Sequence, residues 1–537
     1  MEAANPPIEV SETAPRATTP PTLQAPVGPS AKEKKYDRQL RLWAAKGQQA
    51  LEESHVLMVV GEEAHGSNST AAGAETLKNL ILPGIGSFTI ADAAKVTEAD
   101  LGVNFFLESE SLHNSRSKEM ARLLEELNPD VGGHYIDQSL EEWCRPDNLK
   151  PYNLILVCAP AGEKHLSLLC EYASQSSIPL AYIHSAGFYS SFSIQLPSEF
   201  PIVETHPDTD TISDLRLTNP FSELATAERD LPDFDSMSDH DHGHIPYILI
   251  LLRYLSKWQE SNKGIPSNFK EKTEFREFVR SNTRTSNPEG GEENWDEACA
   301  AVLKTIASYT IGSGCKDMFA MKPCLSPQST SSSFWLIANA IKAFYDKHGV
   351  LPLPGTLPDM KATSEGYISL QNVYKSKARA DVAEVISTVR STESALSHTP
   401  PIPDAEIEAF CKNASHVRVL INPSNEPVPS LRLDQIASRI EESAMLDFNE
   451  LLGVFVALNA PSLPSDALDE LTKQHGYMEQ CIEEVKRAQG AELHNISSVT
   501  GGMVAQEAIK LLTRQYLPVE GTCVYDGIRA KVGVFKV

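Results

Sequence analysis

The sequence predicts an α/β protein in which a doubly wound parallel sheet is interrupted by a large, mostly helical insert. Three observations predict this class. Short apolar runs alternate with amphipathic helical patterns up to about residue 205, which is typical of a parallel α/β sheet. Long helical patterns dominate the following stretch, to about residue 490. Strand patterns then return, so we expect the C-terminus to complete the sheet.

A strand–loop–helix–strand unit anchors this prediction. Val56–Val60 is a continuous apolar run, as expected for a strand that is buried on both faces. The helix that follows carries an apolar face made by Ala74, Leu77, Leu80 and Ile81 and ends at Pro83-Gly84. Phe88–Ala91 is the next strand, and Asp92 stands at its carboxyl end. Rossmann-like folds place an acidic group there to bind a ribose hydroxyl.

The loop of this unit, from Gly61 to Gly73, lacks most glycines of a phosphate-binding loop. Glycines let backbone N–H groups approach a phosphate without interference from Cβ atoms. Only Gly73 stands at the mouth of the helix, and Glu62 and Glu63 add negative charge where an anion would bind. The pattern is therefore that of a nucleotide-binding fold with a disabled phosphate site.

The remaining elements follow the same three-part organisation. In the first part we expect helices at 32–51, 117–127 and 164–176, and strands at 154–157 and 180–184. In the insert we expect long helices, for example at 246–262, 271–280, 295–307, 333–348, 370–391 and 404–413. Gly501-Gly502 opens a last helix, and strands follow near 522–526 and 531–537. The predicted domains are a disordered tail (1–31), the first part of the α/β domain (32–205), the insert (206–490) and its C-terminal completion (491–537).

Two segments of the predicted insert are not simple helices. The stretch 229–244 is acidic and carries three alternate histidines, which could bind a metal. Because no second ligand cluster is apparent, we favour a solvated loop and predict no metal site. The stretch 351–360 contains three prolines that hold it extended.

Composition excludes several classes of partner. The chain has 537 residues and a formal net charge of -25, which disfavours nucleic acid and anionic membranes. No apolar run approaches a membrane span, and the N-terminus lacks a signal-peptide pattern. The nine cysteines form no C-x-x-C pair, which argues against a zinc knuckle or a disulfide framework. We therefore expect a protein of the reducing cytoplasm or nucleus.

Several stretches match motifs of a known superfamily. They are 35–43 (KYDRQLRLW), 77–90, 104–107, 244–247, 333–335, 355–360, 370–374 and 501–507. From about residue 32 to the C-terminus, the chain resembles the ubiquitin-activating-enzyme superfamily. Within it, the middle motifs resemble those of regulatory subunits of heterodimeric neddylation-activating enzymes. The resemblance implies a Rossmann-like, adenylation-type domain and an insert that corresponds to a catalytic-cysteine domain without its cysteine.

The chain departs from the catalytic members where they bind nucleotide. Their loop reads G-x-G-G-x-G, and only its last glycine is kept, as Gly73. The other three glycine positions hold Asn68, Thr70 and Ala71. Of their acidic pair only Asp92 remains, their arginine position holds Val103, and their magnesium-binding aspartate has no match at Cys158-Ala159-Pro160. Because phosphate sites need Mg²⁺ and positive charge, these joint losses indicate a pseudo-active half.

The resemblance implies a non-catalytic subunit that binds no cofactor itself. ATP and magnesium would be bound by a catalytic subunit, which adenylates the C-terminal glycine of a ubiquitin-like modifier and carries the thioester cysteine. This chain would complete a heterodimer, have no activity alone, and meet the modifier and, transiently, a conjugating enzyme.

Two rival hypotheses remain open at this stage. In the first, the chain is a self-sufficient activating enzyme with Cys324 as its acyl acceptor, although we favour an ordinary thiol there. In the second, it is a dinucleotide-dependent oxidoreductase. That hypothesis accounts for Asp92 but not for the lost glycines or the long insert.

Two further groups of residues are candidates for contact with the catalytic subunit. Arg38 lies in a Y-x-R-Q element, whose arginine in the superfamily resembles a finger that reaches the nucleotide of the other half. The proline-rich stretch is pre-ordered and would dock at little entropic cost. Its candidate contacts are Leu351, Pro352, Pro354, Gly355, Pro358 and Met360. An exposed connector between helices is the alternative for this stretch.

Overall fold

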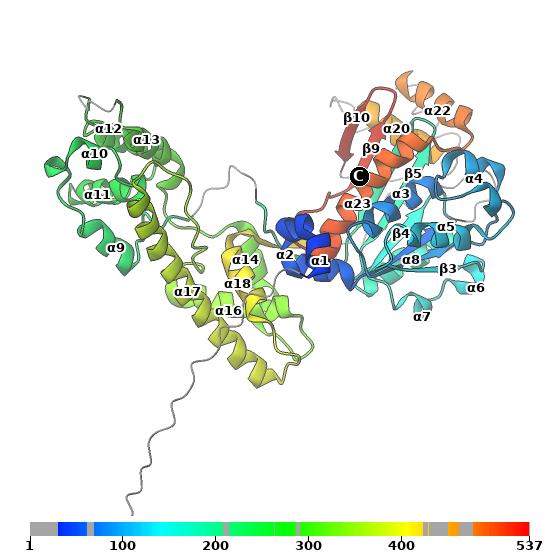
Figure 1. Cartoon of the computed structure of the whole chain (residues 1–537), viewed down its shortest axis with the longest axis horizontal. Coiled ribbons are helices and arrows are strands. Elements are labelled where there is room, and N and C mark those ends of the chain that lie inside the picture. The colour runs from blue at the N-terminus through cyan, green and yellow to red at the C-terminus, as the bar shows by residue number, and fades with distance from the viewer. Residues whose placement is uncertain are drawn as a thin grey trace, which may run out of the picture.

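The computed structural model describes residues 30–61, 69–207, 214–261, 264–285, 290–422, 428, 449–460 and 476–535. Figure 1 shows two bodies, a sheet with its covering helices and an elongated helical region that projects from it. Within the ranges given, no helix is long and apolar enough to cross a membrane. Most of the predicted tail lies outside the described residues.

The α/β body is built on one eight-stranded sheet with the strand order β10-β9-β6-β5-β4-β1-β2-β3. Its strands are β1 (His55–Val60), β2 (Ser87–Ala91), β3 (Gly132–Ile136), β4 (Leu154–Cys158), β5 (Leu180–Ala186), β6 (Tyr189–Gln195), β9 (Thr522–Asp526) and β10 (Lys531–Phe535). Neighbouring strands in the run β5-β4-β1-β2-β3 pair in parallel, which confirms the predicted α/β class. The strands β9 and β10 confirm the predicted C-terminal completion of the sheet. The strand β6 and the antiparallel pairing of these three edge strands were not predicted.

Side-chain alternation along β1 gives the sheet two apolar faces. Val56 and Met58 point into one core, and Leu57 and Val59 point into the other. The first core is covered by α3 (Thr70–Ile81), α5 (Arg116–Glu125) and α23 (His494–Thr513). The second is covered by α6 (Leu140–Trp143), α7 (Pro146–Leu149) and α8 (Glu163–Gln175). The short α1 (Ala31–Lys35) leads into α2 (Asp37–Glu52), which packs against α23 (Figure 1).

The helical insert has two lobes, each with its own apolar core. The first lobe contains α9 (Ser222–Arg229), α10 (Asp239–His242), α11 (Tyr247–Glu260), α12 (Phe269–Arg280) and α13 (Glu293–Thr305). The second contains α14 (Ser313–Ala320), α15 (Lys322–Leu325), α16 (Ser333–His348) and α18 (Asp404–Lys412). The long α17 (Ser364–Leu396) joins them, since Tyr374 lies in the first core and Val385 in the second (Figure 1).

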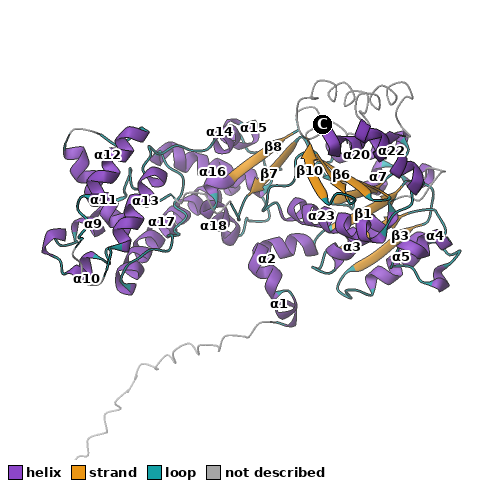
Figure 2. Cartoon of the chain, turned by 90° about the horizontal axis from the view of Figure 1, so that it is seen from above, coloured by secondary structure: helices purple, strands orange, loops and turns teal. Residues whose placement is uncertain are grey.

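The insert ends earlier in the chain than the predicted boundary at 490. A two-stranded antiparallel ribbon of β7 (Glu199–Val203) and β8 (Val417–Ile421) joins it to the sheet body, as Figure 2 shows. The later helices α20 (Asn449–Asn459) and α22 (Gly476–Ala488) pack together. They share a core with Tyr189 of β6 and Val524 of β9. We therefore assign both helices to the α/β body, because their apolar faces cover its sheet.

Candidate functional site

The predicted nucleotide site lies at the N-terminus of α3, beyond the carboxyl ends of β1 and β4. Of the predicted loop positions, Asn68 lies outside the described residues, while Thr70 and Ala71 form the first turn of α3. Gly73 serves close packing, because an added Cβ would lie 2.4 Å from Met58 Cε and 2.5 Å from Cys158 Sγ. The glycine that this chain keeps therefore seats α3 on the sheet.

A carboxylate of the chain itself occupies the N-terminus of α3. Glu492 accepts hydrogen bonds from the backbone N–H of Ala71 at 2.7 Å and from that of Ala72 at 3.0 Å. Ser497 Oγ donates a third at 2.8 Å, and the Glu492 residue is 2% exposed. Helix N-termini attract anions through their free N–H groups and positive dipole end. Glu492 therefore uses the groups that would bind a phosphate.

Glu492 is held there by the segment between α22 and α23. A bridge pairs it with Gly187, whose N–H donates to the carbonyl oxygen of Ala491 at 2.8 Å. Burial raises the pKa of Glu492 to about 7, while the hydrogen bonds from Ala71, Ala72 and Ser497 act in the opposite direction. The carboxylate is thus a buried, fully bonded group rather than a solvated one.

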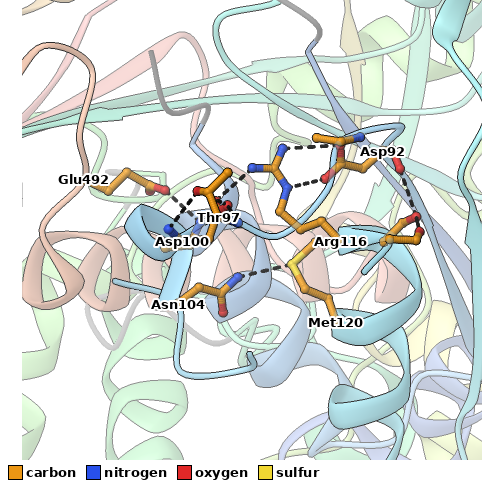
Figure 3. Close-up of polar contacts among 11 residues, drawn as sticks. Asp92, Thr97, Asp100, Asn104, Arg116, Met120 and Glu492 are labelled. Atoms are coloured by element: carbon orange, nitrogen blue, oxygen red, sulfur yellow. Dashed lines mark hydrogen bonds and ion pairs between the residues drawn. The ribbon is translucent and has the colours of Figure 1, made fainter. Parts of the chain in front are cut away.

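The acidic residue at the end of β2 is also occupied. Asp92 accepts hydrogen bonds from Arg116 Nε at 2.6 Å and Nη2 at 3.2 Å, as Figure 3 shows. The same guanidinium donates through Nη1 to Asp100 at 2.8 Å, and Asp100 also accepts from the Thr97 hydroxyl. Burial lowers the pKa of Arg116, but the two carboxylates outweigh burial and raise it. Asp92 is therefore committed to an internal ion pair and not free for a ribose.

The positions that match the catalytic arginine and its neighbour carry no charge. Val103 ends the short helix α4 (Glu98–Val103), and its carbonyl oxygen accepts from His494 Nδ1 at 3.0 Å. Asn104 is buried and donates to Met120 Sδ (Figure 3). Phe105 is 67% exposed and stacks on His494. The site therefore presents apolar and histidine surfaces where the catalytic members carry cationic chemistry.

The structure does not bring Arg38 into this site. Arg38 is exposed on α2. The helix α2, which carries Arg38, lies at the C-terminal end of α23. The contact that shows this is a hydrogen bond of 3.0 Å from the side chain of Gln515, just beyond that end, to the Trp43 carbonyl oxygen in α2. Glu492 lies just before the other end of α23, and a helix of 20 residues spans about 30 Å. Arg38 therefore cannot serve a nucleotide at the α3 N-terminus of its own chain.

Four of the six candidate contacts in the proline-rich stretch occupy buried positions. Leu351, Pro352, Gly355 and Met360 are buried within the insert. Leu351 belongs to the core of the second lobe and Met360 to that of the first, so both side chains pack mainly within the insert. Pro354 and Pro358 are partly exposed, and their contact with a partner stays a prediction.

Neither the thiols nor the histidine stretch supplies an alternative site. All nine cysteines are buried, and burial raises the pKa of Cys324 to about 11. His242 is buried, lies 2.7 Å from Glu292 and stacks on Trp295, so it belongs to the first-lobe core. Among the described residues, no group of three or more ligands could hold a metal ion.

Sequence reasoning missed Arg116 and Glu492, which decide what the site can do. Arg116 lies 24 residues after Asp92, and Glu492 lies 421 residues after Ala71. Neither stands in a motif that marks such a role. One weak signal in the sequence was the number of acidic residues around the loop without a matching cation. It indicated that a cation should lie near them in the folded chain.

Comparison with known proteins gives a consistent result. Residues 36–537 match the model of the ThiF family. The chain is 35% identical to a NEDD8-activating enzyme E1 regulatory subunit of Danio rerio, over 95% of this chain and 99% of that protein. It is 35% identical to the Xenopus laevis subunit, over 94% and 99% of the two chains. The Arabidopsis thaliana subunit AXR1 is 31% identical over 94% and 96%.

Proposed function

The chain belongs to the ThiF family and, within it, to the regulatory subunits of the NEDD8-activating enzyme E1, and we propose that it serves its catalytic partner without binding ATP itself. As a regulatory subunit of a neddylation E1, it acts together with a catalytic subunit. In this proposal the partner binds ATP and Mg²⁺, adenylates the modifier and carries the thioester.

One observation carries the proposal. The N-terminus of α3, where an anion would bind, is occupied by Glu492. Its carboxylate accepts hydrogen bonds from the backbone N–H groups of Ala71 and Ala72 in the first turn. A triphosphate would have to displace a buried carboxylate, and the nearby guanidinium of Arg116 is already paired with Asp92 and Asp100. Two negative charges in one site repel each other, so ATP binding at this end is disfavoured.

The alternative of a self-sufficient activating enzyme is not favoured. It needs an exposed, readily ionised thiol, whereas Cys324 is fully buried and its pKa is raised. It also needs a nucleotide site, which Glu492 and Arg116 argue against.

We extend the proposal to Arg38, which would reach the ATP of the partner. Its guanidinium is exposed on a helix of the α/β body. An arginine stays charged and can bind phosphate through two N–H groups, as arginine fingers supplied in trans do. The conjugating enzyme would bind the assembled heterodimer transiently, in the cytoplasm or the nucleus.

Two measurements on purified protein test the proposal. Calorimetric titration of this chain alone with ATP and Mg²⁺ is expected to give no saturable heat, whereas the heterodimer binds. ATP–pyrophosphate exchange by the heterodimer is expected to slow with Arg38→Ala at unchanged assembly. Arg41→Ala on the same helix is the matched control, since Arg41 pairs with Asp37 and is exposed. Micromolar ATP affinity of this chain alone would contradict the proposal. Equal exchange rates for Arg38→Ala and wild type at every ATP concentration would remove Arg38 from it.

A further inference from the structure

A cleft lies at the junction of the two lobes of the insert. Its volume is about 270 Å³, and its walls come from residues 214–219, 304–312, 351–354 and 411–416. The first two segments lie next to α9 and α13 of the first lobe, and the last begins in the final turn of α18 of the second. The proposed function concerns the α/β body and assigns no role to this cleft.

One wall of the cleft is formed by the segment 307–312, whose backbone N–H groups have no acceptor among the described residues. Residues 307–312 connect α13 to α14 without helix or strand structure. Throughout the described part of the chain, none of their six N–H groups has a hydrogen-bond acceptor. Ser308, Thr310 and Gly312 are exposed, so these donors are accessible from solvent. A row of free N–H groups is what a protein offers to the carbonyl oxygens of an extended peptide.

The rim of the cleft carries positive charge in a strongly acidic chain. Lys304 and Lys412 stand at the C-terminal ends of α13 and α18 and line the cleft from opposite lobes. Both are exposed, and neither has an ion-pair partner among the residues that the structure describes. Asp214 is the sole acidic residue of the lining, and Arg216 neutralises it at 2.8 Å. The two ammonium groups are therefore left for a ligand.

The cleft is held open by contacts between its walls. Arg216 is 7% exposed, and its Nη2 donates to the Leu351 carbonyl oxygen. The hydroxyl of Tyr309 accepts from the Leu351 N–H at 2.9 Å, and Thr218 Oγ1 donates to the Ala307 carbonyl oxygen at 2.8 Å. The buried side chains of Leu217 and Ile311 add apolar surface to the lining. A preformed cleft binds at low cost, because little ordering is needed.

We propose that this cleft binds a short, extended acidic peptide segment of a partner protein. Carbonyl oxygens of the peptide accept from the N–H groups of 307–312, and its carboxylates meet Lys304 and Lys412. The apolar lining takes alternate side chains of the same peptide, as side chains of an extended chain point to opposite sides. The volume of about 270 Å³ is below the roughly 300–1,000 Å³ of pockets for drug-sized ligands, so the cleft encloses only part of a short peptide, whose other residues lie outside it.

The test uses the intact heterodimer and a fluorescein-labelled hexapeptide of alternating aspartate and leucine. Fluorescence anisotropy is expected to show saturable binding that weakens as ionic strength rises, since exposed charges are screened by salt. A peptide of the same length with asparagine in place of aspartate is expected to bind about ten-fold more weakly, which corresponds to about 1.4 kcal/mol.

Three variants, one of them a control, locate the binding. Lys304→Glu combined with Lys412→Glu is expected to weaken binding of the acidic peptide about ten-fold. Lys118→Glu combined with Lys270→Glu makes the same change of charge at exposed positions outside the cleft and is expected to leave the affinity unchanged. Thr310→Pro removes one N–H donor from the wall and is expected to weaken both peptides. An unchanged unfolding temperature shows that each variant is folded.

Three results would overturn the proposal. The first is equal affinity for the aspartate and asparagine peptides. The second is an equal loss of affinity in the cleft variant and the control variant. The third is an absence of saturable binding to the wild-type heterodimer at low ionic strength.

Discussion

The N-terminus of α3 and the cleft of the insert both present backbone N–H groups, but these groups have hydrogen-bond acceptors in the first region and none among the described residues in the second. At α3 the donors meet the carboxylate of Glu492, and the nearby Asp92 is paired with Arg116. In the cleft the donors of 307–312 have no acceptor in the described part of the chain, and Lys304 lacks an ion-pair partner there.

The same architecture can therefore place backbone N–H groups next to an internal partner in one region and leave them without a described one in another. A buried donor or acceptor without a partner is costly, so a chain that no longer binds a ligand must supply internal partners. At the N-terminus of α3, the N–H groups of Ala71 and Ala72 have their partner within the chain, the carboxylate of Glu492. The cleft is exposed to water, so its donors can stay unpaired and remain open to a ligand.

The largest effect is expected from removing the internal cation of the α3 site. Arg116→Ala leaves the carboxylates of Asp92 and Asp100 buried without a counter-ion. Breaking a buried ion pair in this way costs about 3–5 kcal/mol of unfolding free energy. Denaturant unfolding measures the change. Arg122→Ala is the control, because Arg122 makes three ion pairs at the surface and is 48% exposed. Equal losses in both variants would show that the buried network is not special.

The next effect is the dependence of stability on pH that Glu492 causes at the N-terminus of α3. The pKa of Glu492 is raised from its ordinary value of 4.5 to about 7. Between these values the folded chain binds more protons than the unfolded one, so this group makes stability fall as pH rises. The fall amounts to at most about 3 kcal/mol, at 1.36 kcal/mol for each pKa unit.

Glu492→Gln isolates this contribution, because glutamine does not titrate. Unfolding free energies of wild type and variant are measured from pH 4 to pH 8, and their difference is expected to change with pH in the direction given. Parallel curves for the two proteins would mean that Glu492 keeps an ordinary pKa in the folded chain.

A smaller effect on stability is expected from substitutions where α23 packs against α3. A Cβ added at Gly501 would lie 2.6 Å from Glu75 Cβ and 2.8 Å from Thr76 N. Gly501→Ala is therefore expected to destabilise the α/β body by about 1–3 kcal/mol. Gly502 has no atom within 4 Å of an added Cβ, so Gly502→Ala is expected to stabilise the helix by about 0.5–1 kcal/mol. Thermal unfolding of the two adjacent variants compares them directly, and shifts of the same sign would refute the crossing argument.

The smallest effect is expected from the thiol of the insert. Cys324→Ala should leave thioester formation on the catalytic partner unchanged, because the Cys324 side chain is fully buried in the core of the second lobe. Non-reducing gel electrophoresis of the reconstituted heterodimer with modifier and ATP detects the thioester. Loss of that band in a folded variant would assign chemistry to the insert, which the structure argues against.

Features that depend on neighbouring residues can be predicted from the sequence. The apolar run Val56–Val60 and the helix after it follow from local periodicity, and both are present as β1 and α3. The loss of glycines ahead of Gly73 already indicated a damaged phosphate site. Boundaries set by local pattern alone were less exact, as α17 (Ser364–Leu396) is longer than the predicted helix at 370–391.

Which polar and apolar groups become partners depends on the folded arrangement of distant segments. Glu492 reaches Ala71 across 421 residues of sequence, and the insert ends at β8 because the later helices cover the sheet. The tertiary structure also buries Leu351 and Met360 between helices, although their stretch has the composition of an exposed connector. The physical reason is the same in each case. Periodicity and turn chemistry act over a few residues, whereas the partner of a buried polar or apolar group is set by which distant segments the fold brings together.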